Sequence, residues 1–144
     1  MTQEEQKGLL LRDLSARLQY GVKCKLIYNN KAIKDEDATL FAVDKYGHFL
    51  FAEFGEDTRE FVCKPYLIPL SKMTEEQLFE VQEILGKNEI KIEDGFLSIV
   101  DSDRNTISYL EILALLEWFY KNHFDIYGLI PMGLAIDATG LNIY

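Results

Sequence analysis

Residues 22–28 read VKCKLIY, and this stretch decides the class of fold. Every second residue from Val22 to Tyr28 is apolar, and two of the three positions between them are lysines. A period of two is typical of a β-strand with one buried face and one solvated face. The residues before it follow a helical period instead, so we expect the chain to combine an N-terminal helix with a sheet.

The segment before the strand predicts a helix over residues 3–19. Thr2 and Glu5 have the spacing of a capping box, in which each side chain satisfies a backbone N–H at the helix start. Four leucines then fall on one helical face, namely Leu10, Leu11, Leu14 and Leu18. Gly21 is expected to end the helix, because glycine tolerates the left-handed backbone that follows a helix terminus.

The segment after the strand predicts further short strands. Residues 38–43 and 48–54 flank a polar turn at 44–47, which favours a hairpin, and residues 59–63 form the next strand. Successive strands of this kind favour a curled antiparallel β-meander, with an SH3-like half-barrel as the specific expectation. Pro65 is expected to end the meander, because proline cannot donate a hydrogen bond to a neighbouring strand.

Two further helices are expected in the second half of the chain. Thr74 and Gln77 form another capping box, and Gly86 closes the helix that they start. One side of this helix is interpreted as a solvated face, which carries Glu76, Glu80 and Glu83. Ser108 starts the last helix, which is predicted over residues 108–121.

A second hairpin is expected between these helices. Residues 89–93 and 96–100 flank Asp94-Gly95, a dipeptide that favours a tight turn between alternating segments. The tail, residues 122–144, carries only two charged side chains and is expected to pack against the rest of the chain. No linker or internal repeat is visible, so residues 1–144 are interpreted as a single α+β domain with an N-terminal helix and C-terminal helices.

The 144 residues carry a net charge of −9, with 48% apolar and 27% charged residues, which is ordinary for a globular protein. A DNA-binding protein usually has a basic stripe, and none is visible, so nucleic acid is not expected as a partner. No apolar run reaches the roughly 18 residues that a membrane span needs, so no membrane association is expected. The polar start MTQEEQKG argues against a signal peptide and predicts a cytoplasmic protein.

Aromatic side chains are concentrated near the C-terminus, where there is little charge. On a helical wheel Trp118 falls on the polar side of the last helix, so either the tail or a partner should cover it. We therefore expect an exposed apolar patch of at least ~400 Å² around Trp118 or the tail. The candidate interaction surface comprises Trp118, Tyr120, Phe124, Tyr127 and Tyr144.

Three polar residues in the same region form a second candidate site, namely His123, Asp125 and Asp137. The structural interpretation is that the dipole at the end of the last helix stabilises a protonated His123. The chemical alternative is a His–Asp acid–base pair, or a set of metal ligands that Asp137 completes. This alternative would make the protein a small hydrolase-like or metal-dependent enzyme.

Other chemical signals in the sequence are weak. Asp101, Asp103 and Asn105 match only the first half of an EF-hand loop, so they predict a polar turn, with a weak ion site as the alternative. Cys24 and Cys63 have no metal or redox spacing and are interpreted as buried thiols, with a disulfide as the alternative. Catalysis by either would require a nearby histidine. No nucleotide-binding or zinc-protease motif occurs, so no cofactor is expected.

The excess of acidic residues allows one further hypothesis. A protein that mimics nucleic acid would present its carboxylates along one face and block a DNA-binding enzyme. A charge of −9 is modest for such a mimic. The residues that would have to line that face are Glu76, Glu80, Glu83, Glu89, Glu93, Asp94, Asp101 and Asp103.

Three stretches, Leu9–Lys25, Lys64–Gln77 and Asn122–Tyr144, together resemble a family of small uncharacterised proteins from gut anaerobic bacteria and their phages or mobile elements. The closing stretch, NHFDIYGLIPMGLAIDATGLNIY, is the most specific part of this resemblance. The resemblance implies a single-domain cytoplasmic accessory protein. It supplies no activity, cofactor or catalytic residue.

These observations favour a non-enzymatic protein–protein interaction module. No cluster of reactive side chains stands out, whereas the aromatic C-terminal segment and the acidic helix face offer surfaces to another macromolecule. The expected partner is an unidentified protein or a second copy of the chain. The enzyme and the nucleic-acid mimic remain the alternatives.

Overall fold

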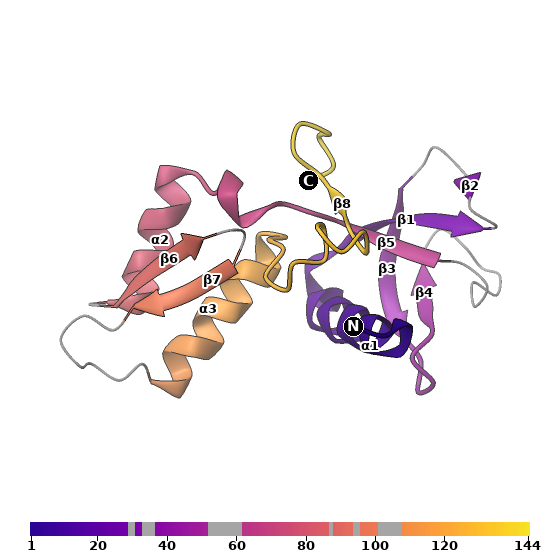
Figure 1. Cartoon of the computed structure of the whole chain (residues 1–144), viewed down its shortest axis with the longest axis horizontal. Coiled ribbons are helices and arrows are strands. Elements are labelled where there is room, and N and C mark those ends of the chain that lie inside the picture. The colour runs from indigo at the N-terminus through magenta and orange to yellow at the C-terminus, as the bar shows by residue number, and fades with distance from the viewer. Residues whose placement is uncertain (29–30, 33–36, 52–61, 87, 94–95, 101–107) are drawn as a thin grey trace.

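The computed structural model describes residues 1–28, 31–32, 37–51, 62–86, 88–93, 96–100 and 108–144. Figure 1 shows two groups of elements, with part of the C-terminal tail lying between them. The first group holds the N-terminal helix and the main sheet, and the second holds two helices and a two-stranded hairpin. The expected α+β class is confirmed.

The N-terminal helix α1 spans Gln3–Arg17 and continues as the 3-10 turn η1, Leu18–Tyr20. Both hydrogen bonds of the predicted capping box are present between Thr2 and Glu5. Gly21 has a φ of 67°, a left-handed conformation that costs energy for a residue with a side chain. The predicted helix and its glycine stop are confirmed.

The main sheet is mixed and has the strand order β4-β3-β1-β5-β8. The strands are β1 Lys23–Tyr28, β2 Lys31–Ala32, β3 Ala38–Val43, β4 Phe49–Phe51, β5 Val62–Leu67 and β8 Ile136–Asp137. β1 lies in the middle, antiparallel to β3 and the short β2 on one side and to β5 on the other. The predicted sequential order of a meander is therefore wrong, and the SH3-like half-barrel is not confirmed. Strand β8 adds to β5 in parallel.

The hairpin predicted around residues 44–47 is confirmed by the antiparallel pairing of β3 with β4. The Asp44 carboxylate accepts hydrogen bonds from the backbone N–H groups of Tyr46 and His48, and it lies 2.9 Å from Nδ1 of the His48 ring. These bonds lower the pKa of Asp44, the backbone bond from His48 most of all. Residues 52–61, which include the ends of two predicted strands, lie outside the described part of the chain.

Strand β5 runs through Pro65 and ends at Leu67, so the proline does not end the sheet as predicted. Pro65 lies opposite Cys24 of β1, and pairing with β8 starts at Tyr66. Within the described residues, one side of β5 is therefore unpaired at Pro65. A strand tolerates proline where no neighbouring strand needs a hydrogen bond from the backbone nitrogen at that position.

The second group contains α2 Glu75–Leu85, β6 Glu89–Glu93, β7 Phe96–Val100 and α3 Tyr109–Lys121, preceded by the 3-10 turn η2 Leu70–Lys72. The capping box of Thr74 and Gln77 and the N-cap at Ser108 are present, so both predicted helices are confirmed. β6 and β7 pair antiparallel as predicted, and their turn at 94–95 lies outside the described residues. In the part of the chain that the structure describes, no helix has the length and apolar character needed to cross a membrane.

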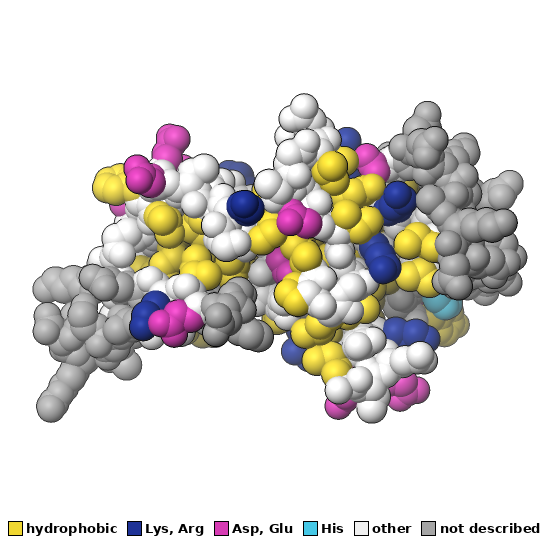
Figure 2. All heavy atoms as spheres, turned by 45° about the horizontal axis from the view of Figure 1, so that its top comes forward, with side chains coloured by type: hydrophobic (Ala, Val, Ile, Leu, Met, Phe, Trp, Pro, Cys, Tyr) yellow, Lys and Arg dark blue, Asp and Glu magenta, His cyan; other side chains and the backbone are white. Residues whose placement is uncertain are grey.

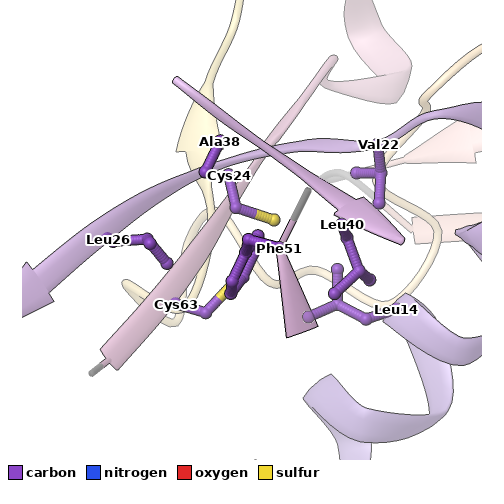
Figure 3. Packing of buried hydrophobic residues seen from close by; sticks show 8 residues of the cluster. All are labelled: Leu14, Val22, Cys24, Leu26, Ala38, Leu40, Phe51 and Cys63. Carbon is purple, nitrogen blue, oxygen red and sulfur yellow. The ribbon is translucent and has the colours of Figure 1, made fainter. Parts of the chain in front are cut away.

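Each group of elements has its own hydrophobic core. In the first, α1 covers the sheet, and Figure 3 shows the core residues Leu14, Val22, Cys24, Leu26, Ala38, Leu40, Phe51 and Cys63. The second core contains Leu70, Val81, Leu85, Leu115, Phe119 and Phe124. A third cluster of Leu67, Leu129 and Ala135 attaches the tail to β5. The prediction that both cysteines are buried thiols is confirmed.

Candidate interaction surface and the Arg17 cluster

The end of α1 carries a buried ion pair. Arg17 and Asp13 lie one helical turn apart, and both side chains are fully shielded from solvent. Arg17 donates from Nε and Nη2 to the two oxygens of Asp13 at 2.8 Å each, and Nη2 also donates to the Phe124 carbonyl at 2.6 Å. The planar guanidinium group suits this two-pronged contact, and its third bond ties α1 to the segment after α3.

Tyr120 completes this cluster from the side of α3. Its ring centre lies 5.1 Å from the guanidinium carbon of Arg17, close enough for cation–π attraction. Its hydroxyl lies 3.2 Å from the hydroxyl of Tyr127 in the tail. Burial raises the pKa of Tyr120, and the bond with Tyr127 acts in the same direction. Tyr120 and Tyr127 of the predicted interaction surface therefore contribute to holding α1, α3 and the tail together.

Asp125 is buried and shapes the turn that starts the tail. Its two carboxylate oxygens accept hydrogen bonds from the backbone N–H groups of Leu129, at 2.8 Å, and Ile130, at 2.9 Å. Carboxylates commonly satisfy free N–H groups at turns in this way. Because these oxygens bind backbone, Asp125 does not orient the His123 ring as the partner in an acid–base pair would.

His123 follows α3 with a left-handed φ of 61°. Its ring stacks on that of Tyr144, with ring centres 3.5 Å apart and planes 6° apart. Burial, helped by the charge of Arg17, lowers the pKa of His123 to about 4. The ring is therefore neutral at pH 7. The predicted protonated histidine is wrong, because loss of solvent outweighs the attraction of the helix dipole.

The Tyr144 hydroxyl joins the tail to two strands. It donates to the Tyr66 carbonyl of β5 at 2.8 Å and accepts from the Lys23 N–H of β1 at 3.0 Å. Burial raises the pKa of this hydroxyl, so it stays protonated and able to donate. The residue as a whole is still 47% exposed, so one part of it is anchored while another part meets solvent.

Replacing Tyr144 with phenylalanine tests this anchor. The variant leaves the Tyr66 carbonyl and the Lys23 N–H without their partner, so we expect the free energy of unfolding to fall by about 1–2 kcal/mol. Urea unfolding, followed through the fluorescence of the single tryptophan, measures the change. Tyr46→Phe, at a position 73% exposed, is the matched control and should change stability by less than about 0.5 kcal/mol. Equal losses of the free energy of unfolding in the two variants would show that the Tyr144 hydroxyl does not anchor the tail.

Asp137 is exposed on β8, whereas Asp125 is buried. Its carboxylate accepts hydrogen bonds from the hydroxyl and the N–H of Thr139, and these bonds lower the pKa of Asp137. The three residues of the predicted polar site therefore have separate partners. Among the described residues, no three side chains of metal-binding type gather at one point, and the loop at 101–105 lies outside those residues.

Trp118 is half-buried, and the chain itself covers it. Its ring stacks on that of Phe124, with ring centres 5.6 Å apart and planes 11° apart. Its Nε1 donates a hydrogen bond of 2.8 Å to Glu80 of α2. Phe124 is completely buried and offers no surface to a partner. Both the tail and α2 therefore cover Trp118, and the most exposed apolar side chains of this helix lie nearer its start.

The first half of α3 exposes a set of large apolar side chains that we call the α3 face. Tyr109 and Leu110 are 74% and 75% exposed, and Ile112 and Leu113 are 38% and 40% exposed. Spacings of three and four residues make these side chains neighbours on the helix surface. The other side of the helix, which includes Leu115, is buried in the second core.

The helical wheel did not separate these two sides of α3. On a helical wheel Tyr109, Ile112 and Leu113 fall with Phe119 on one wide apolar face, yet only Phe119 of these four is buried. A wheel reports how wide an apolar face is and does not report which part of it a neighbouring helix covers. An apolar face wider than a single helix contact was the signal in the sequence that could have revealed the α3 face.

Acidic side chains are exposed on both helices of this group. Glu76 and Glu83 on α2 and Glu117 on α3 are exposed. Figure 2 shows acidic side chains at the edge of the hydrophobic area formed by this group. Glu117 lies one helical turn beyond Leu113, so the α3 face has a carboxylate as its neighbour.

The row of acidic residues that a nucleic-acid mimic would need is described only in part. Glu76, Glu80 and Glu83 follow the exposed side of α2, whereas Glu93 forms an ion pair of 2.6 Å with Lys91. This hypothesis stays a prediction. The members that lie outside the described side chains are Glu89, Asp94, Asp101 and Asp103.

Comparison with protein-family models, with curated proteins and with solved structures gives no match to this chain. The resemblance of residues 9–25, 64–77 and 122–144 to proteins of gut anaerobes therefore stays a prediction.

Proposed function

We propose that this protein is a non-enzymatic interaction module that binds another protein through the α3 face. The supporting observation is that four neighbouring apolar side chains on one helix, Tyr109, Leu110, Ile112 and Leu113, are left in contact with water. Contiguous apolar surface of this kind commonly marks a protein contact. The polar groups around Arg17 support a non-enzymatic role, because their hydrogen bonds are made to other groups of the fold and hold it together.

The partner that we propose is a basic amphipathic helix. Such a helix can lay its apolar side on the α3 face, while its lysines or arginines approach Glu117 and the exposed carboxylates of α2. A second copy of this chain fits less well. Each copy carries a net charge of −9, and a symmetric contact would bring Glu117 of both copies toward one interface.

Two synthetic helical peptides test the choice of partner. Both have the same length and the same leucine stripe, and one carries lysine and the other glutamate at the solvated positions. We expect the cationic peptide to bind at least about tenfold more tightly, measured by fluorescence anisotropy, because its charges complement those of α2 and α3. Light scattering in the same buffer gives the mass of the protein alone, and we expect a monomer.

The combined Leu110→Ser and Leu113→Ser variant locates the contact. Both positions are exposed, so the fold should persist, and we expect cationic peptide binding to weaken at least about tenfold. Phe41→Ser is the matched control, because Phe41 is 61% exposed on β3 of the other group. Equal affinity for the two peptides, an equal loss in the control, or a dimer that the leucine substitutions dissociate would overturn this proposal.

We also propose that residues 1–144 act as one cytoplasmic domain. The bond from Arg17 to the Phe124 carbonyl links the two groups of elements, which supports a single unit. The unpaired thiols Cys24 and Cys63 are compatible with a reducing compartment. The resemblance to proteins of mobile elements fits an accessory protein that works through another macromolecule.

A further inference from the structure

A cleft of about 520 Å³ lies in the group that holds α1 and the main sheet. Its walls come from α1, from the turn between β3 and β4, and from the described ends of β4 and β5. Small-molecule sites commonly have volumes of roughly 300–1,000 Å³, so the cleft has the size of a ligand site.

The walls of the cleft are mainly apolar. Leu10 and Leu11 of α1 line it together with Phe49 and Phe51 of β4. Gly8 lines it as well, and a Cβ atom built at Gly8 would meet nothing within 4 Å. Glycine inside a helix is less stable than alanine, and close packing does not require a glycine here. Its missing side chain does keep this part of the cleft open.

Two side chains that can bind an anion line the same cleft. Lys7 is exposed on α1, and the His48 side chain is 36% exposed next to the turn. Asp44 lies 2.9 Å from Nδ1 of His48 and fixes the ring. Contact of this ring with a ligand therefore has to be through Nε2, which donates a hydrogen bond only when both ring nitrogens carry a proton. Apolar walls with a few polar groups are the usual composition of a small-molecule site.

We propose that this cleft binds a small amphipathic carboxylate. The apolar body of the ligand lies against the leucines and phenylalanines, and its carboxylate binds Lys7 and His48. Cys63, which also lines the cleft, belongs to the same core cluster as Phe51 and is 4% exposed (Figure 3). A bound ligand covers this thiol. The site is separate from the α3 face, so each proposal can fail without the other.

Decanoate and decanol are the probes, because they share one alkyl chain and differ in charge. Isothermal titration calorimetry of the full chain should show decanoate binding at least about tenfold more tightly than decanol, since a hydrogen bond to a charged group contributes more than a neutral one. Equal affinities would show that the cleft selects only for apolar surface and would overturn the carboxylate assignment. Absence of binding would overturn the site.

Substitutions locate the ligand. Gly8→Leu should abolish decanoate binding by filling the cleft, whereas Gly8→Ala keeps the binding, and thermal unfolding checks that both variants fold. The Lys7→Gln and His48→Gln double variant should bind decanoate about as weakly as decanol. Lys121→Gln removes an exposed cation from α3 and is the matched control. Unchanged decanoate affinity in Gly8→Leu, or an equal loss in Lys121→Gln, would contradict the assignment.

Alkylation of Cys63 gives a measure of ligand binding that does not depend on the heat of binding. Iodoacetamide should modify Cys63 of the folded protein at least about tenfold more slowly when decanoate saturates the cleft, as measured by mass spectrometry of peptides. Cys24 is completely buried and serves as the internal reference for unfolding. An alkylation rate at Cys63 that decanoate leaves unchanged would show that the ligand binds elsewhere.

Discussion

The Arg17→Ala variant will lose about 3–5 kcal/mol of the free energy of unfolding, because it leaves the Asp13 carboxylate buried without its partner. Arg17 and Asp13 are both fully shielded from solvent, and Arg17 also binds the Phe124 carbonyl. Burial raises the pKa of Asp13, and the hydrogen bonds and charge of Arg17 oppose that rise. Urea unfolding followed through Trp118 fluorescence measures the loss. A change this large is a substantial part of the stability of an ordinary domain.

Two companion variants show whether the orphaned charge causes this loss. Asp13→Leu combined with Arg17→Met removes both charges of the pair, so we expect it to recover at least about half of the lost stability. Arg12→Ala removes an exposed arginine from the same helix and should cost less than about 1 kcal/mol. If Arg17→Ala costs no more than Arg12→Ala, the ion pair does not stabilise the fold.

Acidification will destabilise the protein through His123. The folded pKa of His123 is about 4, compared with an ordinary value of 6.5, and the difference sets an upper limit of about 3–4 kcal/mol, which the solvent around this partly exposed ring reduces. Between these two values the unfolded chain binds the proton and the folded chain does not, so stability increases with pH. The contribution of the neutral ring is complete above pH 6.5 and is lost as the pH falls toward 4.

The His123→Asn variant isolates this titration. Asparagine tolerates the left-handed φ of 61° better than most residues and carries no titratable group. Urea unfolding of both proteins between about pH 4 and pH 7 gives their difference in the free energy of unfolding. As the pH falls, the free energy of unfolding of the protein with His123 should decrease relative to that of the variant, since the other titrating groups are common to both. A difference that is independent of pH would contradict the lowered pKa of His123.

Helix ends and tight turns were predictable from the sequence because their signals are local. The pairs Thr2 with Glu5 and Thr74 with Gln77 satisfy backbone groups three residues away, without any distant contact. Asp44 likewise organises the β3–β4 turn through bonds to residues two and four positions on. Signals of this range act in almost the same way wherever the segment lies in the fold.

Strand order was not predictable in this way, because it depends on segments far apart in the chain. A short alternating segment such as β1 has two edges that can form hydrogen bonds, and its sequence does not say which strand pairs with which edge. In the structure β5 takes the second edge of β1, and β8 from the tail then pairs with β5. This order also explains why Pro65 can lie within a strand.

The features of the candidate surfaces also fall into those that the local sequence predicts and those that distant contacts decide. Composition and spacing were sufficient to place the helices, the hairpins and an aromatic C-terminal segment. Contacts across the fold decided that Phe124 is buried, that His123 is neutral and that the α3 face is exposed. The bond from Arg17 to Phe124 joins residues 107 positions apart, and no local pattern encodes it. A side chain is buried only when a second surface packs against it, so its burial is determined by the packing of the whole chain.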